Sequence, residues 1–151
     1  MAWCKSSTRL PKDLVFLAQS DTTVGFGSQS RLRLDLIKSR PSGKHYITAI
    51  TSLALAPRVP QKYKNLVRRS KKITFVVNGR SFRLAHLTPT SAYLRGFAWY
   101  YTTSANRSTE SFDREFCFAN ADLIVEDSRG LKESRSSSII KLGTRRLKKL
   151  R

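Results

Sequence analysis

The sequence has few of the features that define several large classes of protein. Its 151 residues include two cysteines, Cys4 and Cys117, with no CxxC pair and no histidine at ligand spacing. Neither a disulfide scaffold nor a protein-bound metal is therefore expected, and both cysteines are interpreted as thiols. The longest apolar runs, residues 14–18 and 97–101, are far too short to span a bilayer. Since the N-terminal residues also lack the apolar core of a secretory signal, we expect a cytoplasmic protein with no membrane partner.

The common catalytic and phosphate-binding motifs are also missing. No GxxxxGK[ST] loop, GxSxG elbow or HExxH pair occurs in the chain. The GFGSQS segment at residues 25–30 lacks the third glycine of a dinucleotide fingerprint. His45 and His86 have no partner in the sequence and receive no role. These absences disfavour hydrolase and metalloenzyme functions.

Acidic residues are scarce, and this imbalance is the strongest compositional signal. The chain has 29 lysines and arginines against 10 acids, a net charge of +19. Residues 58–83 hold nine basic residues and no acid, and residues 129–151 hold nine against Glu133 alone. Such a balance favours a polyanionic partner, although a generally basic surface of solvated side chains is the alternative. The predicted RNA-binding residues are Arg68, Arg69, Lys71, Lys72, Arg145, Arg146, Lys148 and Lys149.

The length and the 40% hydrophobic content fit one folded domain spanning residues 1–151, with no repeats and no linker. Apolar runs predict strands at residues 14–18, 45–51, 97–103, 121–126 and 137–142, the last of these followed by a basic tail, residues 143–151. Asn78–Gly79 between two strand-like runs predicts a hairpin with a type I′ turn.

Helix signals alternate with these strands. Capping residues, Pro and Gly mark four helix boundaries, and apolar spacing marks the buried sides of two helices. The first expected helix begins at Ser28 or Ser30, with Leu32, Leu36 and Ile37 on one side, and the second begins at Pro60, with Tyr63, Leu66 and Val67 on one side. The third begins at Thr88–Pro89 and ends at Gly96, and the fourth begins at Ser111 or Asp113. This alternation predicts a single α/β domain built on a mixed sheet, with strands such as residues 97–101 at central positions.

Three polar segments follow predicted strands or helices, at residues 20–27, 38–44 and 103–108. In α/β sheets ligands gather beyond the strand ends, where loops and helix N-termini offer free N–H groups. Taken singly, each segment is also consistent with an ordinary turn or with cations at a helix C-terminus. Their order along the chain therefore matters more than any one of them.

Together, the segments resemble the YrdC-like family of threonylcarbamoyl-AMP synthases. The similarity covers residues 14–142. The matching segments are QSDTTVGFG at residues 19–27, KSRP at residues 38–41, ITFV at residues 73–76, TSANRS at residues 103–108, DLIV at residues 122–125 and SSI at residues 137–139.

The resemblance implies an enzyme that makes threonylcarbamoyl-AMP from ATP, bicarbonate and L-threonine and releases pyrophosphate. That product serves threonylcarbamoyladenosine modification of tRNA, through downstream transfer proteins. The implied fold is a twisted α/β sheet with flanking helices around a concave positive cavity, and some members bind double-stranded RNA or tRNA. The alternative is a non-catalytic RNA-binding or ribosome-associated protein on the same fold.

The same resemblance implies the site residues. Lys38 and Arg40 are the expected catalytic cations, since a triphosphate needs fixed charge and a guanidinium offers a planar fork. Ser104 and Asn106 lie two apart, so both point to one side of an extended segment. Mg²⁺ is expected to enter with ATP. The predicted ATP-binding residues are Lys38, Arg40, Lys44, Thr74, Ser104 and Asn106, and Thr22 is expected beside L-threonine.

Several positions depart from the family pattern. Val24 replaces the usual Tyr, Gln19 the usual Pro, Lys71–Lys72 a Pro-Gly pair, and Thr109 a common Gly. The chain is also shorter than typical members and has no accessory domain to close over the site. These departures leave open a reduced enzyme, an enzyme that needs a partner, or a binding protein.

Overall fold

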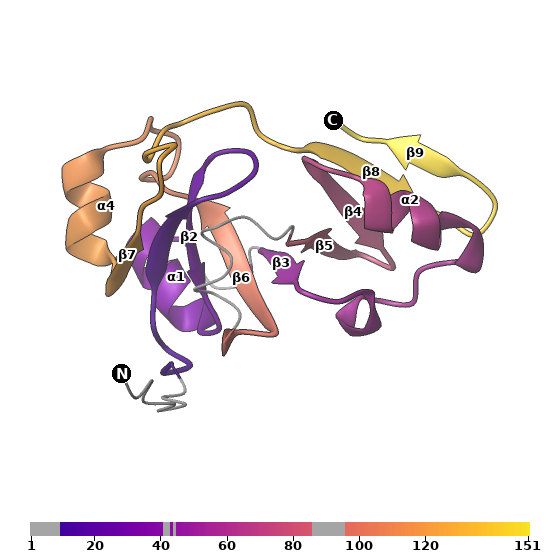
Figure 1. Ribbon diagram of the computed structural model, residues 1–151, viewed down its shortest axis with the longest axis horizontal. Helices are drawn as coiled ribbons and strands as arrows, with labels where there is room; N and C mark the ends of the chain where they lie inside the picture. Colours follow the sequence, from indigo (N-terminus) through magenta and orange to yellow (C-terminus); the bar gives the residue numbers. More distant parts are fainter. Residues whose placement is uncertain (1–9, 41–42, 44, 86–95) are drawn as a thin grey trace, which may run out of the picture.

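The computed structural model describes residues 10–40, 43, 45–85 and 96–151. These residues form one nine-stranded mixed sheet in the order β7-β1-β2-β6-β3-β5-β4-β8-β9, with three α-helices (Figure 1). The strands are β1 (Phe16–Gln19), β2 (Val24–Ser28), β3 (Ile47–Ile50), β4 (Ile73–Val77), β5 (Arg80–Leu84), β6 (Trp99–Ser104), β7 (Leu123–Val125), β8 (Ser138–Leu142) and β9 (Leu147–Lys149). The α-helices are α1 (Arg31–Lys38), α2 (Lys64–Arg69) and α4 (Arg114–Asn120), and the 3₁₀ helices are η1 (Leu53–Leu55) and η2 (Gln61–Tyr63). The predicted α/β class is confirmed.

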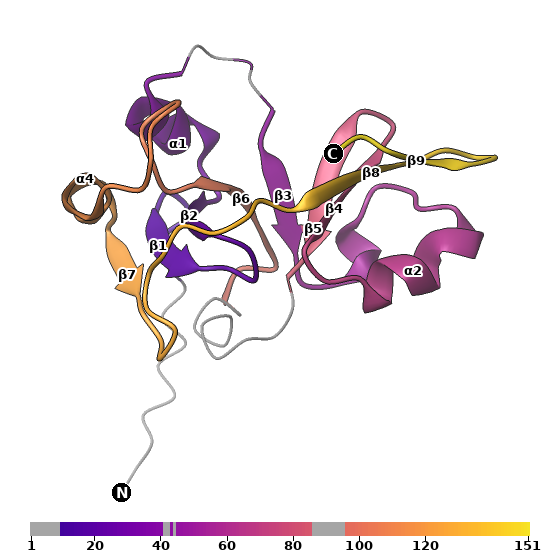
Figure 2. The same ribbon diagram turned by 90° about the horizontal axis from the view of Figure 1, so that it is seen from above.

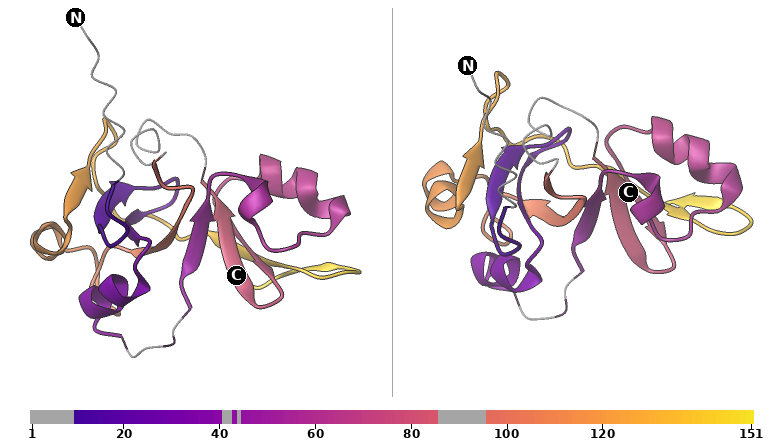
Figure 3. Two further views of the ribbon diagram at one scale, coloured as in Figure 1. Left: turned by 90° about the horizontal axis from the view of Figure 1, so that it is seen from below. Right: turned by 60° about the horizontal axis from the view of Figure 1, so that its bottom comes forward.

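The sheet divides into two halves that meet between β6 and β3. The α1/α4 half contains β7, β1, β2 and β6, and the α2 half contains β3, β5, β4, β8 and β9. The helices α1 and α4 lie at one end of the molecule, whereas α2 and β9 lie at the other (Figures 1 and 3). After β7, residues 126–137, here named the crossing segment, run across the molecule to β8 (Figure 2).

Each half has its own hydrophobic core. Leu17 and Phe26 belong to the core of the α1/α4 half, which also includes Leu34 of α1. Phe75 and Phe82 lie on paired strands in the core of the α2 half, with ring centroids 5.9 Å apart. Both cores are built mainly from buried apolar side chains, and burial of these side chains stabilises each half.

Local sequence signals are realised where turn or cap chemistry is strong. The predicted hairpin forms β4 and β5, and Asn78 (φ 49°) and Gly79 (φ 75°) both adopt the positive φ that a type I′ turn requires. The side chain of Ser30 caps α1 and that of Asp113 caps α4, each by accepting a hydrogen bond from a main-chain N–H in the first helical turn.

The predicted buried side of α1 is wrong. Leu32 and Leu36 are 70% and 69% exposed, whereas Leu34 is fully buried and Ile37 packs beside it. An eight-residue helix gives little more than two turns of periodicity, so tertiary contacts choose its buried side. In α2, Val67 is buried as predicted, whereas Leu66 is 37% exposed.

The C-terminal residues are not a tail. Residues 147–149 form β9, which pairs antiparallel with β8, so the strand at residues 138–142 is not the last one. The strand β6 lies between β2 and β3 as expected of a central strand, but Trp99, Tyr100 and Tyr101 are only half-buried. The helix expected from Thr88–Pro89 lies outside the described residues.

Candidate functional site

A cavity of about 260 Å³ opens where the turn between β1 and β2 meets the end of β6, at the junction of the two halves. Gly25 lies opposite Ser104 in the β2–β6 ladder. A Cβ at Gly25 would lie 2.9 Å from the carbonyl oxygen of Thr103, so only glycine allows this close approach. The cavity is lined by Ser20, Thr22, Thr23, Gly25, Arg40, His45, Tyr46, Ile47, Arg83, Thr102, Thr103, Ser104, Ser136, Ser137 and Arg151.

Three arginines and an array of hydroxyl groups give the cavity its chemistry, and no Asp or Glu is among the lining residues. Arg40 follows α1, and its buried Nε has no hydrogen-bond partner within the described part of the chain. Its guanidinium carbon lies 5.8 Å from the ring centroid of Tyr46. A buried polar atom without a partner is rare in folded proteins, and here it belongs to a cation at a cavity wall. The site therefore suits an anion with several oxygens.

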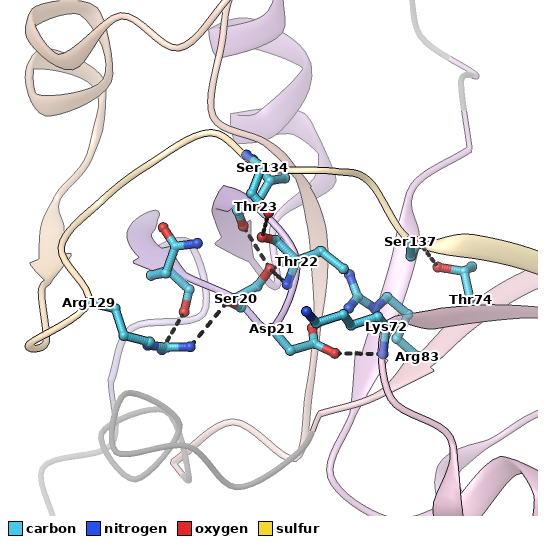
Figure 4. Close-up of polar contacts among 11 residues, drawn as sticks. Ser20, Asp21, Thr22, Thr23, Lys72, Thr74, Arg83, Arg129, Ser134 and Ser137 are labelled. Carbon is cyan, nitrogen blue, oxygen red and sulfur yellow. Dashed lines mark hydrogen bonds and ion pairs between the residues drawn. The ribbon is translucent and has the colours of Figure 1, made fainter.

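Arg83 is the second arginine, and it is held in place from the opposite half. Its Nη2 pairs with the carboxylate of Asp21, and its Nη1 donates to Oγ1 of Thr22 at 3.0 Å (Figure 4). Asp21 also accepts a hydrogen bond from the main-chain N–H of Lys72 at 3.0 Å. Asp21 therefore joins the β1–β2 turn to β5 and to the residue before β4, and Arg83 holds Thr22 at the cavity.

The third arginine, Arg151, comes from the residues that follow β9. Its Nε and Nη2 donate to the carbonyl oxygen of Ser137 at 3.3 and 3.1 Å. The hydroxyl of Ser137 lies 2.7 Å from that of Thr74, and both residues are buried (Figure 4). Thr74 therefore lies behind the cavity wall and reaches the site through Ser137. The motif comparison gave no role to Arg83, Ser137 or Arg151, because only the pairing of distant strands brings them to the cavity.

Lys38 is turned away from the cavity and holds the end of β6. Its side chain is 1% exposed. Nζ donates to the carbonyl oxygen of Ser104 at 3.0 Å, to Oδ1 of Asn106 at 2.6 Å and to the carbonyl oxygen of Asn106. These three acceptors match the three donors of an ammonium group. Lys38 therefore positions the 104–106 segment in this structure.

The other predicted site residues are spread over the molecule. Ser104 lines the cavity, whereas Asn106 lines an adjoining hollow of about 250 Å³ that also contains Glu133 and Ser134. Lys44 lies outside the described residues. Arg68, Arg69, Lys71, Lys72, Arg145, Arg146, Lys148 and Lys149 are exposed and line neither of these hollows.

The crossing segment closes one side of the site. Arg129 donates to the carbonyl oxygens of Gln19 and Ser20, and Ser134 Oγ donates to that of Thr22 at 2.5 Å (Figure 4). The side-chain oxygen of Gln19 accepts the N–H of Lys132 at 2.9 Å. Gln19, which stands where the family usually has Pro, therefore holds this segment against the β1–β2 turn.

The shifted pKa values add little to the chemistry of the site. Burial, together with a 2.7 Å hydrogen bond to Asp35, raises the pKa of Tyr46 to about 12. Burial raises the pKa of Tyr100 to about 12 and that of the buried Cys117 thiol to about 11. These groups are protonated at neutral pH. Among the described residues, no group of three or more His, Cys, Asp or Glu side chains is placed to hold a metal ion.

Two departures from the family pattern have a backbone conformation that favours glycine. Lys72 (φ 57°) and Thr109 (φ 69°) both adopt left-handed conformations. Both stand where the family commonly has glycine, the residue that adopts this region without steric cost. At both positions the backbone therefore has a conformation that favours glycine, although lysine and threonine occupy them.

The fold of the chain is that of the Sua5/YrdC-type domains. Sua5 from P. abyssi, in a crystal structure with L-threonine, superposes with a TM-score of 0.70 and 18% identity over 91% of this chain and 50% of that one. E. coli YciO superposes with a TM-score of 0.69 and 16% identity over 93% of this chain and 83% of that one. The resemblance of the motifs is therefore confirmed by the three-dimensional fold.

One curated sequence relative adds to these likenesses. An uncharacterized protein of Mycoplasma pneumoniae, a homolog of MG259, is 32% identical over 107 residues, which are 67% of this chain and 22% of that protein. No family model matches the sequence. The chain spans about half the length of Sua5 and about a fifth of the Mycoplasma protein. Within the described residues, no helix is both long and apolar enough to cross a membrane.

Proposed function

We propose that the cavity binds ATP and L-threonine, and that the protein forms threonylcarbamoyl-AMP for the modification of tRNA. The observation that carries this proposal is the meeting of Arg40, Arg83 and Arg151 with serine and threonine hydroxyls in one acid-free cavity. The motif order and the Sua5/YrdC fold support the same assignment. The threonine in the Sua5 structure agrees with an amino-acid substrate.

The residues divide into those that touch substrate and those that position them. Arg40 and Arg151 would contact phosphate oxygens, with Ser104 offering a hydroxyl between them. Thr22, fixed by Arg83, would contact L-threonine. The exact role of Lys44 stays a prediction.

Lys38, Thr74 and Asn106 take positioning roles in this proposal. Lys38 was predicted to contact ATP, but its buried ammonium and its three hydrogen bonds support a role in holding Ser104 and Asn106. Thr74 would act through its hydrogen bond to Ser137.

The chemistry needs no covalent nucleophile from the protein. The threonine amine adds to the carbon of bicarbonate, and loss of water gives a carbamate. A carbamate oxygen then attacks the α-phosphorus of ATP, the new P–O bond forms, and the bond to pyrophosphate breaks. Fixed arginines balance the charge that develops on the phosphoryl oxygens, and the cavity holds the reactants together. Mg²⁺ would enter with ATP, since no Asp or Glu side chain lines the cavity to hold it alone.

The test is incubation of the protein with ATP, bicarbonate and labelled threonine, with detection of pyrophosphate and the labelled adenylate. Arg40→Gln is expected to lower turnover by about 10²- to 10³-fold, as for loss of one donor to a transition-state oxyanion. The matched control is Arg114→Gln, which removes a surface arginine of α4 whose pairing with Glu126 is exposed. It should retain full turnover.

Two other outcomes would reject the proposal. No turnover by the wild-type protein, together with retained RNA binding, would favour the non-catalytic RNA-binding or ribosome-associated alternative. Full turnover by the Arg40 variant would show that the cavity is not the reaction site. Transfer of the adenylate to tRNA by separate proteins can be assayed only after the first step is observed.

A further inference from the structure

The acidic residues are absent from one half of the molecule. No Asp or Glu occurs between Asp35 and Glu110 or after Glu133. The described elements of the α2 half, from β3 to β5 together with β8 and β9, therefore carry no carboxylate side chain. The basic residues of this half have no acidic neighbour along their own strands and helices.

A groove of about 790 Å³ lies in this half, apart from the cavity described above. One wall comes from the segment that leads into α2, the other from the end of β8 and the turn after it, and the floor includes the turn between β4 and β5. Three cations line it: Arg58 and Lys64 on one wall and Lys141 on the other. The remaining lining residues are Val59, Pro60, Gln61, Val77, Asn78, Gly79, Leu142, Gly143 and Thr144.

The two walls of the groove are tied together. Nζ of Lys62 donates to the carbonyl oxygen of Arg145 at 2.8 Å, which joins the entry to α2 to the β8–β9 turn. That turn is tight, because the N–H of Gly143 donates to the carbonyl oxygen of Arg146 at 3.0 Å and a Cβ on Gly143 would lie 2.8 Å from the same oxygen. The segments that carry the cations of the two walls are therefore joined to each other.

The charge in this groove is not balanced by ion pairs. Among the described residues, Arg33, Arg83, Arg114 and Arg129 form ion pairs with acids, and none of these four arginines lines the groove. Three of these four pairs lie in the α1/α4 half or the crossing segment, and the fourth is Arg83–Asp21 at the cavity. Since neighbouring cations repel one another, an unpaired cluster of this kind gives a strong positive potential and attracts a polyanion.

A further hollow, of about 810 Å³, borders both the groove and the cavity. It shares Asn78 and Gly79 with the groove and His45 and Tyr46 with the cavity. Arg31 and Arg80 line it, and no acid does. The groove, this hollow and the cavity are therefore neighbours, and no Asp or Glu lines any of them, which fits a linear polymer with regularly repeated charge.

We infer that this groove, whose cations are Arg58, Lys64 and Lys141, binds the phosphate backbone of an RNA strand. Concave walls favour RNA over a membrane, because a flat bilayer surface does not enter a groove between two protein walls. The neighbouring hollow and cavity, which are also lined by arginines, favour a polymer over a single small anion. Lysine and arginine contacts to phosphate supply affinity without reading sequence, so the groove binds RNA of any sequence.

The test compares two triple variants that lose the same net charge. One is Arg58→Gln, Lys64→Gln and Lys141→Gln in the groove. The other is Arg107→Gln, Arg114→Gln and Lys132→Gln, at exposed positions of the α1/α4 half and the crossing segment. The probes are an unmodified tRNA transcript, a single-stranded RNA oligonucleotide and vesicles containing phosphatidylserine, and affinity is measured as a function of salt concentration.

The groove variant should bind RNA roughly 10-fold or more weakly at moderate salt, and its salt slope should fall by about one for each lost cation. The control variant should lose much less of either. Equal losses in both variants would show that net charge alone attracts RNA and would overturn the proposal. Binding to vesicles without binding to RNA would overturn it too. Should the triple variant not fold, Lys141→Glu alone tests the same wall, with circular dichroism as the check on folding.

Discussion

The two halves of this molecule differ in whether their basic side chains lie beside acidic ones. In the α1/α4 half and the crossing segment, arginines lie beside carboxylates, as in Arg33–Asp122 and Arg129–Asp127. In the α2 half, no element carries a carboxylate side chain. Asp21 reaches across from the α1/α4 half and pairs with Arg83. Charge that is balanced within the fold serves stability, whereas charge left without a partner is available to a ligand.

The candidate site lies at the junction of these two halves. Lys38 belongs to the α1/α4 half, and its ammonium is satisfied by main-chain and amide oxygens. Arg40 lies two residues further along the chain, at the cavity, and its buried Nε has no partner among the described residues. Two cations of one motif thus divide between positioning and binding. The substitution Lys38→Met tests this division, and two further substitutions test the junction of the halves and the loop after β6.

The largest expected effect on stability is that of Lys38→Met. The substitution keeps the length of the side chain but leaves the oxygens of Ser104 and Asn106 without their donor. We expect a loss of about 3 kcal/mol in the free energy of unfolding. Arg40→Gln should cause no such loss, because Nε of Arg40 makes no hydrogen bond that it could lose. Urea unfolding measures both variants. Equal stability of the two would contradict the division of roles.

A smaller loss is expected from Asp21→Asn, which removes the charge that joins the halves. The side chains of Asp21 and Arg83 are 24% and 13% exposed, so the pair is shielded from water. Breaking it should cost about 2 kcal/mol in the free energy of unfolding. Glu126→Gln is the matched control, because its contact with Arg114 is 3.6 Å long and exposed. It should cost less than about 0.5 kcal/mol. Similar losses for both variants would show that the junction is not stabilised by Asp21.

The smallest expected effect is a gain from Thr109→Gly. Thr109 lies in the loop after β6 with φ 69°, a conformation that costs a β-branched residue about 1 kcal/mol and glycine nothing. The greater freedom of glycine in the unfolded chain offsets part of this gain. We expect the free energy of unfolding to rise by roughly 0.5 kcal/mol, measured by thermal unfolding. A clear loss of stability would mean that the threonine side chain contributes more than its backbone costs.

Local chemistry explains which parts of the fold were predictable. The Asn78–Gly79 turn, the Ser30 cap and the Asp113 cap depend on residues a few positions apart, so the sequence reveals them directly. The buried side of α1 and the strand β9 were not predictable in this way. A short helix can present either side to a core, and a short basic strand forms only because β8 offers it an edge.

The same distinction holds for the candidate site. The order of the polar segments determined the family resemblance, and it identified Thr22, Arg40 and Ser104, which line one cavity. Only the tertiary structure decided that Lys38 faces inward and that Arg83 and Arg151 face the cavity, because pairing of distant strands sets these orientations. The sequence by itself determined that the protein is strongly basic, but the fold decided where that charge is left unbalanced. Composition gives only the number of charged residues, whereas the folded chain decides which basic side chains lie beside an acidic one.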